Sequence, residues 1–271
     1  MAKYDYEEGK KRVSAILNDE NEIEEKDRVP SSDNFTYHNG YYSNVTAVFV
    51  DIKDSTALFG ENKKKSTSKI IRAFSSEIIE ILKDDSNLRE IGIRGDCVYA
   101  IYTCSSVEEN VEIMDKVFYT NTYMKMLNKL LSNKGMKNIE AGIGVATAKE
   151  LVVKAGREGS GINNLVWIGK AVTHASKFSG EANRNGMGKI IFSDSFYNII
   201  IDSLVKRNIN KKPREWFKFH NDEELGTYYS CNVVKEEFSD WIDKGIWNNE
   251  VWEWCKLCLI ITNLKKEFMI F

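Results

Sequence analysis

Hydrophobic and polar residues form a regular succession of strand-like and helix-like stretches from residue 45 onward. Residues 45–52 (VTAVFVDI) are an almost continuous apolar run with an acid at its end, which predicts a strand buried on both faces. Ile70, Phe74, Ile78 and Leu82 then recur at helical spacing, which predicts a core-facing helix over about 62–83.

A hairpin follows in IGIRGDCVYAIY (residues 91–102), whose two strand-like runs meet at Gly95-Asp96. Further expected elements are a helix that starts at a capping-box pair (Ser105 and Glu108) and ends near 131, strands at 139–147, 165–167 and 189–192, the start of another strand at 151–154, helices at about 169–180 and 193–206, and a closing strand pair in WFKFH and TYYSCNVV. The order β-α-β-β-α-β, with more βα units appended, predicts an α+β fold with a ferredoxin-like core.

The two ends of the chain differ from this middle part. The pattern predicts a charged helical extension over 1–40, a main domain over 41–235 and a Trp-rich helical extension over 236–271. The tryptophans near the C-terminus favour packing on the domain or across a dimer over a binding platform. Cys255 and Cys258 form one C-x-x-C pair with no second pair nearby, so we favour ordinary thiols over a zinc or redox site.

Composition limits the cellular locations and the classes of binding partner that we expect for this chain. The chain has 271 residues and a formal net charge of -2, so it has no excess of basic residues for general nucleic-acid binding. Five cysteines at irregular spacing indicate no disulfide framework, and no stretch has the length and apolar character of a signal peptide or a membrane span. We expect a cytoplasmic protein with no membrane or nucleic-acid partner.

Two acidic residues occupy positions suited to chemistry. Asp51 ends an apolar strand before a polar turn, where an acid alone is more often a helix cap than a metal ligand. Asp96 lies at the hairpin tip, and the first strand and the hairpin are neighbours in a β-α-β-β core, so the two carboxylates can converge. A carboxylate pair beside a turn rich in backbone N–H groups suits divalent metals that bridge a nucleoside triphosphate.

Three motifs together resemble a known family. Phe49-Val50-Asp51-Ile52 with Ser55-Thr56, Arg94-Gly95-Asp96 in a hairpin, and VWIGKAVTHASKFSG (166–180) resemble the class III nucleotidyl cyclase domain over about 45–235. The D-I-x-x-S-T turn, the R-G-D hairpin and the W-I-G-x-x-V segment are most similar to the pyrimidine cyclases of antiphage defence. That resemblance implies a cyclic UMP or cyclic CMP product, with UTP favoured over CTP, read by a separately encoded effector.

The resemblance also implies roles for individual residues. Asp51 and Asp96 match the metal-binding aspartates, and Ile52 matches the residue whose backbone carbonyl helps to hold the second of two divalent ions, Mn²⁺ or Mg²⁺. The N–H groups of the turn formed by Lys53, Asp54, Ser55 and Thr56 would hold the β- and γ-phosphates. Active sites in this family form between two domains, so a single domain implies a head-to-tail homodimer.

The sequence departs from better-known members at several positions. Thr173 stands where an asparagine usually orients the ribose, and Lys177 stands where an arginine usually meets the phosphates. Lysine keeps the charge but loses the bidentate geometry of arginine. Gly92 and Val166 replace the lysine and the acid that recognise a purine, and without them the purine contacts are lost.

We expect Phe49, Gly92, Arg94 and Val166 to surround the nucleotide, although the sequence does not show which way Arg94 and Tyr99 point. Three other interpretations stay open. They are a purine cyclase with an unusual pocket, a catalytically inactive cyclase fold that senses nucleotides or dimerises, and a metal-dependent phosphodiesterase. Only three histidines are present in the chain, which disfavours the last of these.

Overall fold

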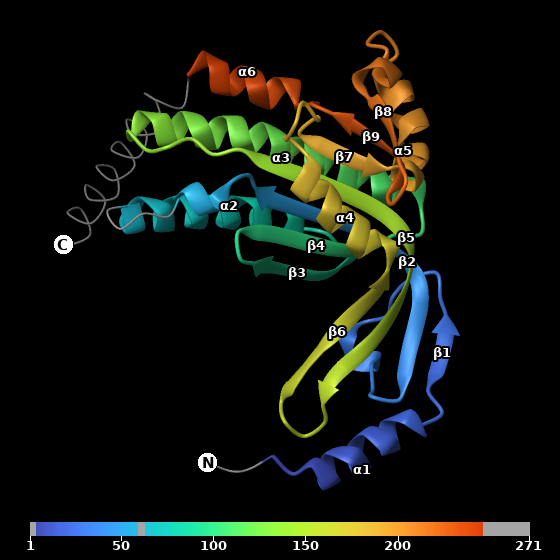
Figure 1. The fold of residues 1–271 in the computed structure, drawn as a ribbon. Helices are drawn as coiled ribbons and strands as arrows, with labels where there is room; N and C mark the ends of the chain where they lie inside the picture. The colour runs from blue at the N-terminus through green and yellow to red at the C-terminus, as the bar shows by residue number, and fades with distance from the viewer. Residues whose placement is uncertain (1–3, 59–62, 246–271) are drawn as a thin grey trace, which may run out of the picture.

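The predicted β-α-β-β-α-β unit lies at the centre of the structure (Figure 1). The computed structural model describes residues 4–58 and 63–245. The unit consists of β2 (Asn39–Ile52), α2 (Lys64–Lys83), β3 (Leu88–Arg94), β4 (Cys97–Thr103), α3 (Val107–Asn133) and β5 (Ala141–Arg157). Its strands lie in the order β3-β4-β2-β5, all antiparallel to their neighbours, which is the ferredoxin-like order and confirms the predicted fold.

The two faces of the sheet are covered by different helices. Side chains alternate between the faces along each strand, so Val48, Val50 and Ile52 of β2 lie on one face while Phe49 and Asp51 lie on the other. The first face packs against α2, α3 and α5 (Asp194–Arg207) in the main hydrophobic core. The predicted stripe of α2 is fully part of this core, with Ile70, Phe74, Ile78 and Leu82 each 2% exposed or less.

On the second face, α4 (Lys170–Glu181) packs against β5 and β2. Gly142 and Gly144 of β5 permit this close approach. A Cβ at Gly144 would lie 2.1 Å from the carbonyl oxygen of Ala175, and a Cβ at Gly142 would lie 2.3 Å from that of Ser179. Two glycines at alternate positions of β5 therefore form the surface on which α4 lies.

The remaining strands extend the sheet beyond β5. β7 (Ile190–Ser193) pairs parallel to β5, β9 (Gly226–Cys231) pairs with β7, and β8 (Lys218–Asp222) forms the outer edge. Short 3-10 turns lie at Ser32–Asn34, Ser55–Leu58 and Pro213–Trp216. The predicted closing strand pair is confirmed by β8 and β9.

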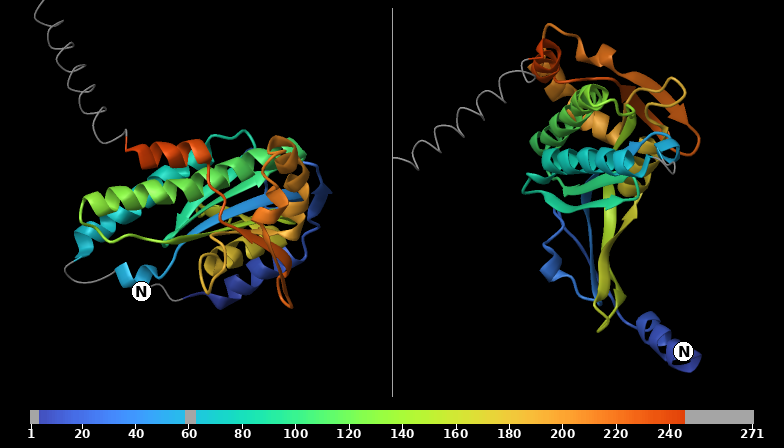
Figure 2. Two further views of the ribbon diagram at one scale, coloured as in Figure 1. Left: turned by 90° about the horizontal axis from the view of Figure 1, so that it is seen from above. Right: turned by 90° about the vertical axis from the view of Figure 1, so that its left-hand side faces the viewer.

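The strands β2 and β5 are longer than the core requires, and their far ends form an arm that projects from the domain (Figures 1 and 2). We define the arm as β1 (Glu22–Glu25), residues 39–44 of β2, residues 149–157 of β5, and β6 (Ile162–Gly169). The prediction of separate strands at 139–147 and 151–154 was wrong. The intervening polar residues stay in register because β2 pairs with one edge of β5 and β6 with the other.

Helical extensions lie at both ends of the described chain. α1 (Tyr6–Leu17) lies near the arm, and α6 (Glu236–Lys244) packs on α3 (Figure 1). Residues 246–271, with most of the predicted Trp-rich extension and the Cys255–Cys258 pair, lie outside the described residues. The capping box of α3 consists of Ser106 and Glu109, one residue later than predicted, because Glu109 accepts from the Ser106 N–H.

Candidate functional site

The two candidate metal carboxylates lie close together at one end of the second sheet face. Asp51, near the end of β2, pairs with Cys97 of β4 on one side and with Gly142 of β5 on the other. Asp96 immediately precedes β4, at the tip of the β3–β4 hairpin. Burial and then the negative charge of Asp96 raise the pKa of Asp51 above its ordinary value. The two carboxylates therefore repel each other, which a divalent cation between them would relieve.

Arg184 offsets part of this negative charge. Its Nη2 donates to Asp51 Oδ2 at 3.1 Å and lowers the pKa of that carboxyl, against the larger effect of burial. Its Nη1 donates to the carbonyl oxygens of Ser179 and Ala182 at the end of α4. Sequence analysis missed Arg184, because nothing in the loop EANRNG indicates that it folds back across β5 toward β2.

The donor set fits a hard divalent cation. Ile52 has a hydrocarbon side chain, which is 2% exposed and lies in the core, so its backbone carbonyl is the group that could serve as a ligand. Two carboxylates and a carbonyl are oxygen donors of the kind that Mg²⁺ and Mn²⁺ take in proteins. Among the described residues, no group of three or more Asp, Glu, His and Cys side chains could hold a metal by itself. An ion at Asp51 and Asp96 would thus complete its shell with water or substrate oxygens.

The turn after β2 offers fewer free N–H groups than the sequence predicts. The Lys53 N–H donates to the Glu140 carbonyl at 2.8 Å, and Lys53 Nζ pairs with the Glu140 carboxylate at 2.9 Å. Both the N–H and the ammonium of Lys53 are therefore bonded to Glu140. This differs from the expectation that the Lys53 N–H is free to bind phosphate. Asp54 turns the chain with a φ of 52°, and its carbonyl accepts from the Ala57 N–H at 2.9 Å. In this turn, Asp54, Ser55 and Thr56 therefore stay the candidates for binding phosphate through their N–H groups.

Tyr99 fills the space beside Gly92. A Cβ at Gly92 would lie 2.7 Å from the Tyr99 hydroxyl oxygen and 2.8 Å from its Cζ, so the tyrosine lies directly over the glycine. Phe49 stacks on the Tyr99 ring, with ring centroids 5.4 Å apart and planes inclined by 18°. The strand pairing places Arg94 on the same face, two residues beyond Gly92. Gly92 thus marks a position occupied by an aromatic ring from the neighbouring strand.

Glu90 fixes this aromatic pair. Its Oε1 accepts a hydrogen bond from the Tyr99 hydroxyl and its Oε2 accepts one from the Trp167 indole N–H, each at 2.7 Å. Burial and the bond to Glu90 raise the pKa of Tyr99 to about 12, so the hydroxyl stays protonated and donates. Trp167 belongs to β6, so Glu90 joins β3 to the arm. Val166, its neighbour, is 39% exposed. Sequence analysis missed Glu90, although alternation places it on the same face as Gly92.

Thr173 and Lys177 are on α4 but lie apart from the carboxylate pair. The Thr173 hydroxyl donates to the Gly169 carbonyl at 2.8 Å, and Lys177 forms an ion pair with Glu224. Within residues 4–58 and 63–245, no hydrogen bond or ion pair joins either side chain to Asp51 or Asp96. Within one chain, the two carboxylates therefore lie near Phe49 and Tyr99, which we call the aromatic cluster. In the described structure they are not bonded to Thr173 or Lys177.

A buried carboxylate holds the beginning of α4. Glu150 is 0% exposed, and its Oε1 accepts from the Ala171 N–H at 2.6 Å. A side chain at Gly169 would clash with it, since a Cβ there would lie 2.6 Å from Oε1. Burial raises the pKa of Glu150, while the N–H groups of Ala171 and Val172 lower it. Glu150 and the two glycines of β5 together fix the position of the helix that carries Thr173 and Lys177.

Comparison with known proteins identifies the family. Residues 37–230 match the model of the adenylate and guanylate cyclase catalytic domain, which spans most of the chain. The chain belongs to this family. The carboxylate pair on a ferredoxin-like sheet thus belongs to a nucleotidyl cyclase domain of class III, and domains of this family use divalent metal ions, consistent with the donor set.

Similar proteins with curated names are cyclases. The chain is 49% identical over 250 residues to a protein from Treponema porcinum named uridylate cyclase, covering 92% of this chain and 85% of that protein. It is 39% identical to a uridylate cyclase from Gulbenkiania mobilis, covering 89% and 97%. The crystal structure of the adenylyl cyclase CyaB from P. aeruginosa shares the fold, with a TM-score of 0.57 and 17% identity over 73% of this chain and 97% of that one.

Two further expectations concern location and sulfur chemistry. In the part of the chain that the structure describes, no helix combines the length and apolar character needed to cross a membrane.

Cys97, Cys104 and Cys231 are free thiols, and burial raises the pKa of each to about 12, which disfavours a reactive thiolate. Cys104 and Cys231 belong to the main hydrophobic core.

Proposed function

We propose that this chain is a pyrimidine nucleotide cyclase that converts UTP, in preference to CTP, into the 3′,5′-cyclic monophosphate and pyrophosphate. The observation that carries the proposal is the Tyr99 ring over Gly92, held by Phe49 and Glu90. This ring occupies space beside the position where purine cyclases carry a base-recognising lysine. The smaller base of a pyrimidine nucleotide suits the remaining space. The uridylate cyclase name of two similar proteins supports the same choice.

The reaction is an intramolecular displacement. The ribose 3′-oxygen attacks the α-phosphorus and loses its proton, while the bond from the α-phosphorus to the bridging oxygen breaks and pyrophosphate leaves with the electron pair. Asp51, Asp96 and the Ile52 carbonyl would hold two divalent ions, with Mn²⁺ preferred over Mg²⁺. Such ions activate the 3′-hydroxyl and stabilise charge on the phosphates. The N–H groups of Asp54, Ser55 and Thr56 would orient the β- and γ-phosphates.

The active enzyme in this proposal is a head-to-tail homodimer. In the described part of the chain, neither Thr173 nor Lys177 forms a hydrogen bond or ion pair with Asp51 or Asp96, which supports a role for them at the site of a second copy. In that arrangement the metal ligands come from one protomer, and the ribose-orienting hydroxyl and the phosphate-binding ammonium come from its partner. Mixing Asp51→Ala protein with Lys177→Ala protein tests this arrangement. Activity above that of either variant alone is expected, and activity no higher than the single variants contradicts it.

The biological setting is part of the same proposal. We place the enzyme in the cytoplasm as a second-messenger synthase of antiphage defence, whose product acts on a separately encoded effector that binds the cyclic nucleotide. The motif resemblance to the pyrimidine cyclases of such systems supports this setting. Loss of protection against phage in cells that carry the Asp51→Ala chain together with the effector is the expected result, and full protection contradicts the role.

One assay tests the activity. Purified protein with Mn²⁺ receives ATP, GTP, CTP or UTP in separate reactions, and products are separated by chromatography and identified by mass. Cyclic UMP is the expected main product, and Asp51→Ala should form none. Cyclic AMP or cyclic GMP as main product would replace the proposal with a purine cyclase. No product from any of the four would favour an inactive cyclase fold.

A further inference from the structure

A cavity lies beside Asp96, between α2 and the β3–β4 hairpin. Its volume is about 570 Å³. The residues that line it are Ser55, Lys64, Thr67, Ser68, Ile71, Arg72, Gly95 and Asp96. Asp96 and Ser55 also belong to the candidate metal site and to the turn after β2, so the cavity continues the active site along α2.

The positive charge of this cavity comes from one lysine and one arginine, Lys64 and Arg72. Lys64 and Arg72 lie eight residues apart, about two turns of α2, which brings both toward the same side of the helix. Across the described ranges 4–58 and 63–245, neither side chain forms a hydrogen bond or an ion pair. The hydroxyls of Thr67 and Ser68 donate to the carbonyls of Leu58 and Lys65. The two cations are thus the groups available to bind an anion.

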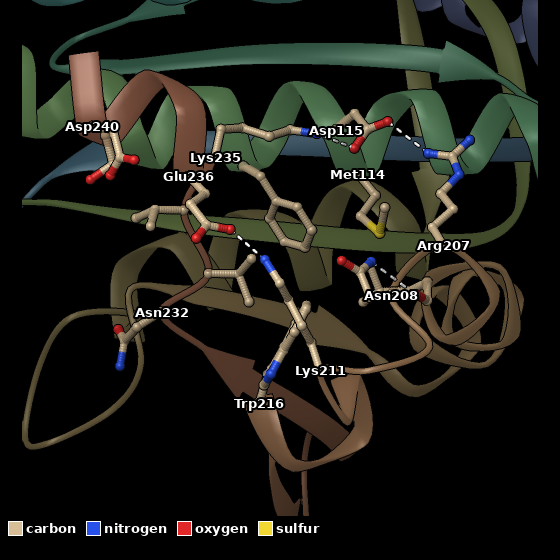
Figure 3. Close-up of a pocket in the computed structure, with 15 residues that line it drawn as sticks. Met114, Asp115, Arg207, Asn208, Lys211, Trp216, Asn232, Lys235, Glu236 and Asp240 are labelled. Atoms are coloured by element: carbon tan, nitrogen blue, oxygen red, sulfur yellow. Dashed lines mark hydrogen bonds and ion pairs between the residues drawn. The ribbon is translucent and has the colours of Figure 1, made fainter. Parts of the chain in front are cut away.

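A second, larger cavity provides the contrast. It has a volume of about 690 Å³ and lies between α3, α5 and α6, as Figure 3 shows. Its cations already form ion pairs, since Arg207 and Lys235 both pair with Asp115, and Lys211 pairs with Glu236 across the cavity. Among the residues that the structure describes, no carboxylate pairs with the cations of the cavity beside Asp96. Asp96, the one acid among the described residues that line it, belongs to the candidate metal pair.

This distribution of charge matches a polyphosphate that extends from the metal site. Divalent ions at Asp51 and Asp96 would neutralise the carboxylates and hold the reacting end of the triphosphate. The distal phosphates then need positive charge farther along the cavity, where Lys64 and Arg72 lie. An arginine can bind phosphate oxygens through two parallel hydrogen bonds, and a lysine contributes a point charge.

We propose that Lys64 and Arg72 bind the distal phosphates of the nucleoside triphosphate and the pyrophosphate that it releases. The proposal rests on the proposed function, because a cyclase must hold and then release this leaving group. The phosphates would then be bound by two side chains of α2 in addition to the backbone N–H groups of Asp54, Ser55 and Thr56. Because the contact involves only phosphate oxygens, its strength is independent of the base.

Binding of inorganic pyrophosphate to the full-length protein tests this assignment. Isothermal titration calorimetry in Mg²⁺ at about 0.15 M salt, which screens nonspecific attraction, would compare the wild type with Lys64→Ala, Arg72→Ala and the double variant. Each single substitution removes one charge-assisted contact, so we expect the dissociation constant to rise about tenfold for each. Arg72→Lys should lie between the wild type and Arg72→Ala.

Lys65 and Lys69 provide matched controls. Both are exposed cations of the same helix, and neither lines the cavity. Lys65→Ala and Lys69→Ala should bind pyrophosphate as the wild type does. Binding as tight as that of the wild type in Lys64→Ala and Arg72→Ala, a tenfold loss in the control variants as well, or no binding by the wild type would each overturn the assignment.

A kinetic measurement separates this proposal from the choice of substrate. In Lys64→Ala and Arg72→Ala, the KM for every triphosphate turned over should rise by a similar factor, leaving the ratio of kcat/KM between bases unchanged. A changed ratio would overturn the assignment to the phosphates. If the protein makes no cyclic nucleotide at all, the proposed function fails, while the calorimetric result still decides whether the cavity binds pyrophosphate.

Discussion

The close approach of α4 to β5 makes Gly144→Ala the sharpest structural test of how the site is held. The added Cβ would lie 2.1 Å from the Ala175 carbonyl oxygen, 2.5 Å from the Ser179 nitrogen and 2.8 Å from the Phe178 Cβ. The first two atoms are backbone, so no side-chain rotation relieves the overlap. Restoring an ordinary contact of at least 3.4 Å requires α4 to move outward by about 1 Å.

The consequences of this movement concern both stability and activity. Overpacking of a tight contact costs about 1–3 kcal/mol, and about 2 kcal/mol lowers the melting temperature by roughly 4–8 °C in a domain of this size. α4 carries Thr173 and Lys177, and a displacement of about 1 Å in a positioning element can reduce turnover by about 100-fold. We therefore expect Gly144→Ala to melt several degrees lower and to lose most of its cyclase activity.

Gly180→Ala is the matched control in the same helix, because a Cβ at Gly180 has no atom within 4 Å. Replacing a helical glycine by alanine stabilises a protein by up to about 1 kcal/mol, so this variant should melt at or above the wild-type temperature and keep its activity. Calorimetry and the cyclase assay measure both quantities. A Gly144→Ala protein with wild-type melting temperature and activity would refute the assigned packing of α4 on β5.

Three further predictions concern single side chains. Asp51→Asn should raise the melting temperature of the metal-free protein, since burial and Asp96 disfavour the ionised carboxylate, and should abolish cyclisation; a lower melting temperature in chelator contradicts this. Burial raises the pKa of Glu150, so the stability that it contributes is lost as pH rises through that raised pKa. Thermal melts should then favour Glu150→Gln over the wild type progressively as the pH rises above the ordinary glutamate pKa of 4.5, and a difference in melting temperature that stays constant with pH contradicts the assigned burial effect. Tyr99→Ala should reduce the ratio of kcat/KM for UTP to that for ATP by about tenfold, because it opens the space beside Gly92, and an unchanged ratio would exclude Tyr99 as a determinant.

The sequence predicts the core because its strongest signals are local. The apolar stripe of α2 and the apolar run in β2 follow helical and strand periodicity, and both occupy the core as predicted. The two candidate metal aspartates are also predictable, since one ends a strand and the other lies at the adjacent hairpin tip. These features depend on neighbours in sequence or on the usual strand order of the fold.

The residues that the sequence does not predict act across distant elements. Glu90 bonds to Trp167 of the arm, which lies 77 residues away in sequence, and Arg184 reaches Asp51 across 133 residues. The length of β5 escapes prediction because Lys149 and Glu150 interrupt the apolar pattern, although Glu150 is itself buried against the start of α4. Side-chain contacts of this kind depend on the packed structure rather than on periodicity.

The most direct test of the central claim is competition among substrates. Wild-type protein with Mn²⁺ is supplied with equal concentrations of ATP, GTP, CTP and UTP in one reaction, and early product ratios give the relative kcat/KM for the four bases. The aromatic cluster over Gly92 predicts that cyclic UMP dominates, with cyclic CMP second and the purine products minor. A majority of cyclic AMP or cyclic GMP would contradict the account.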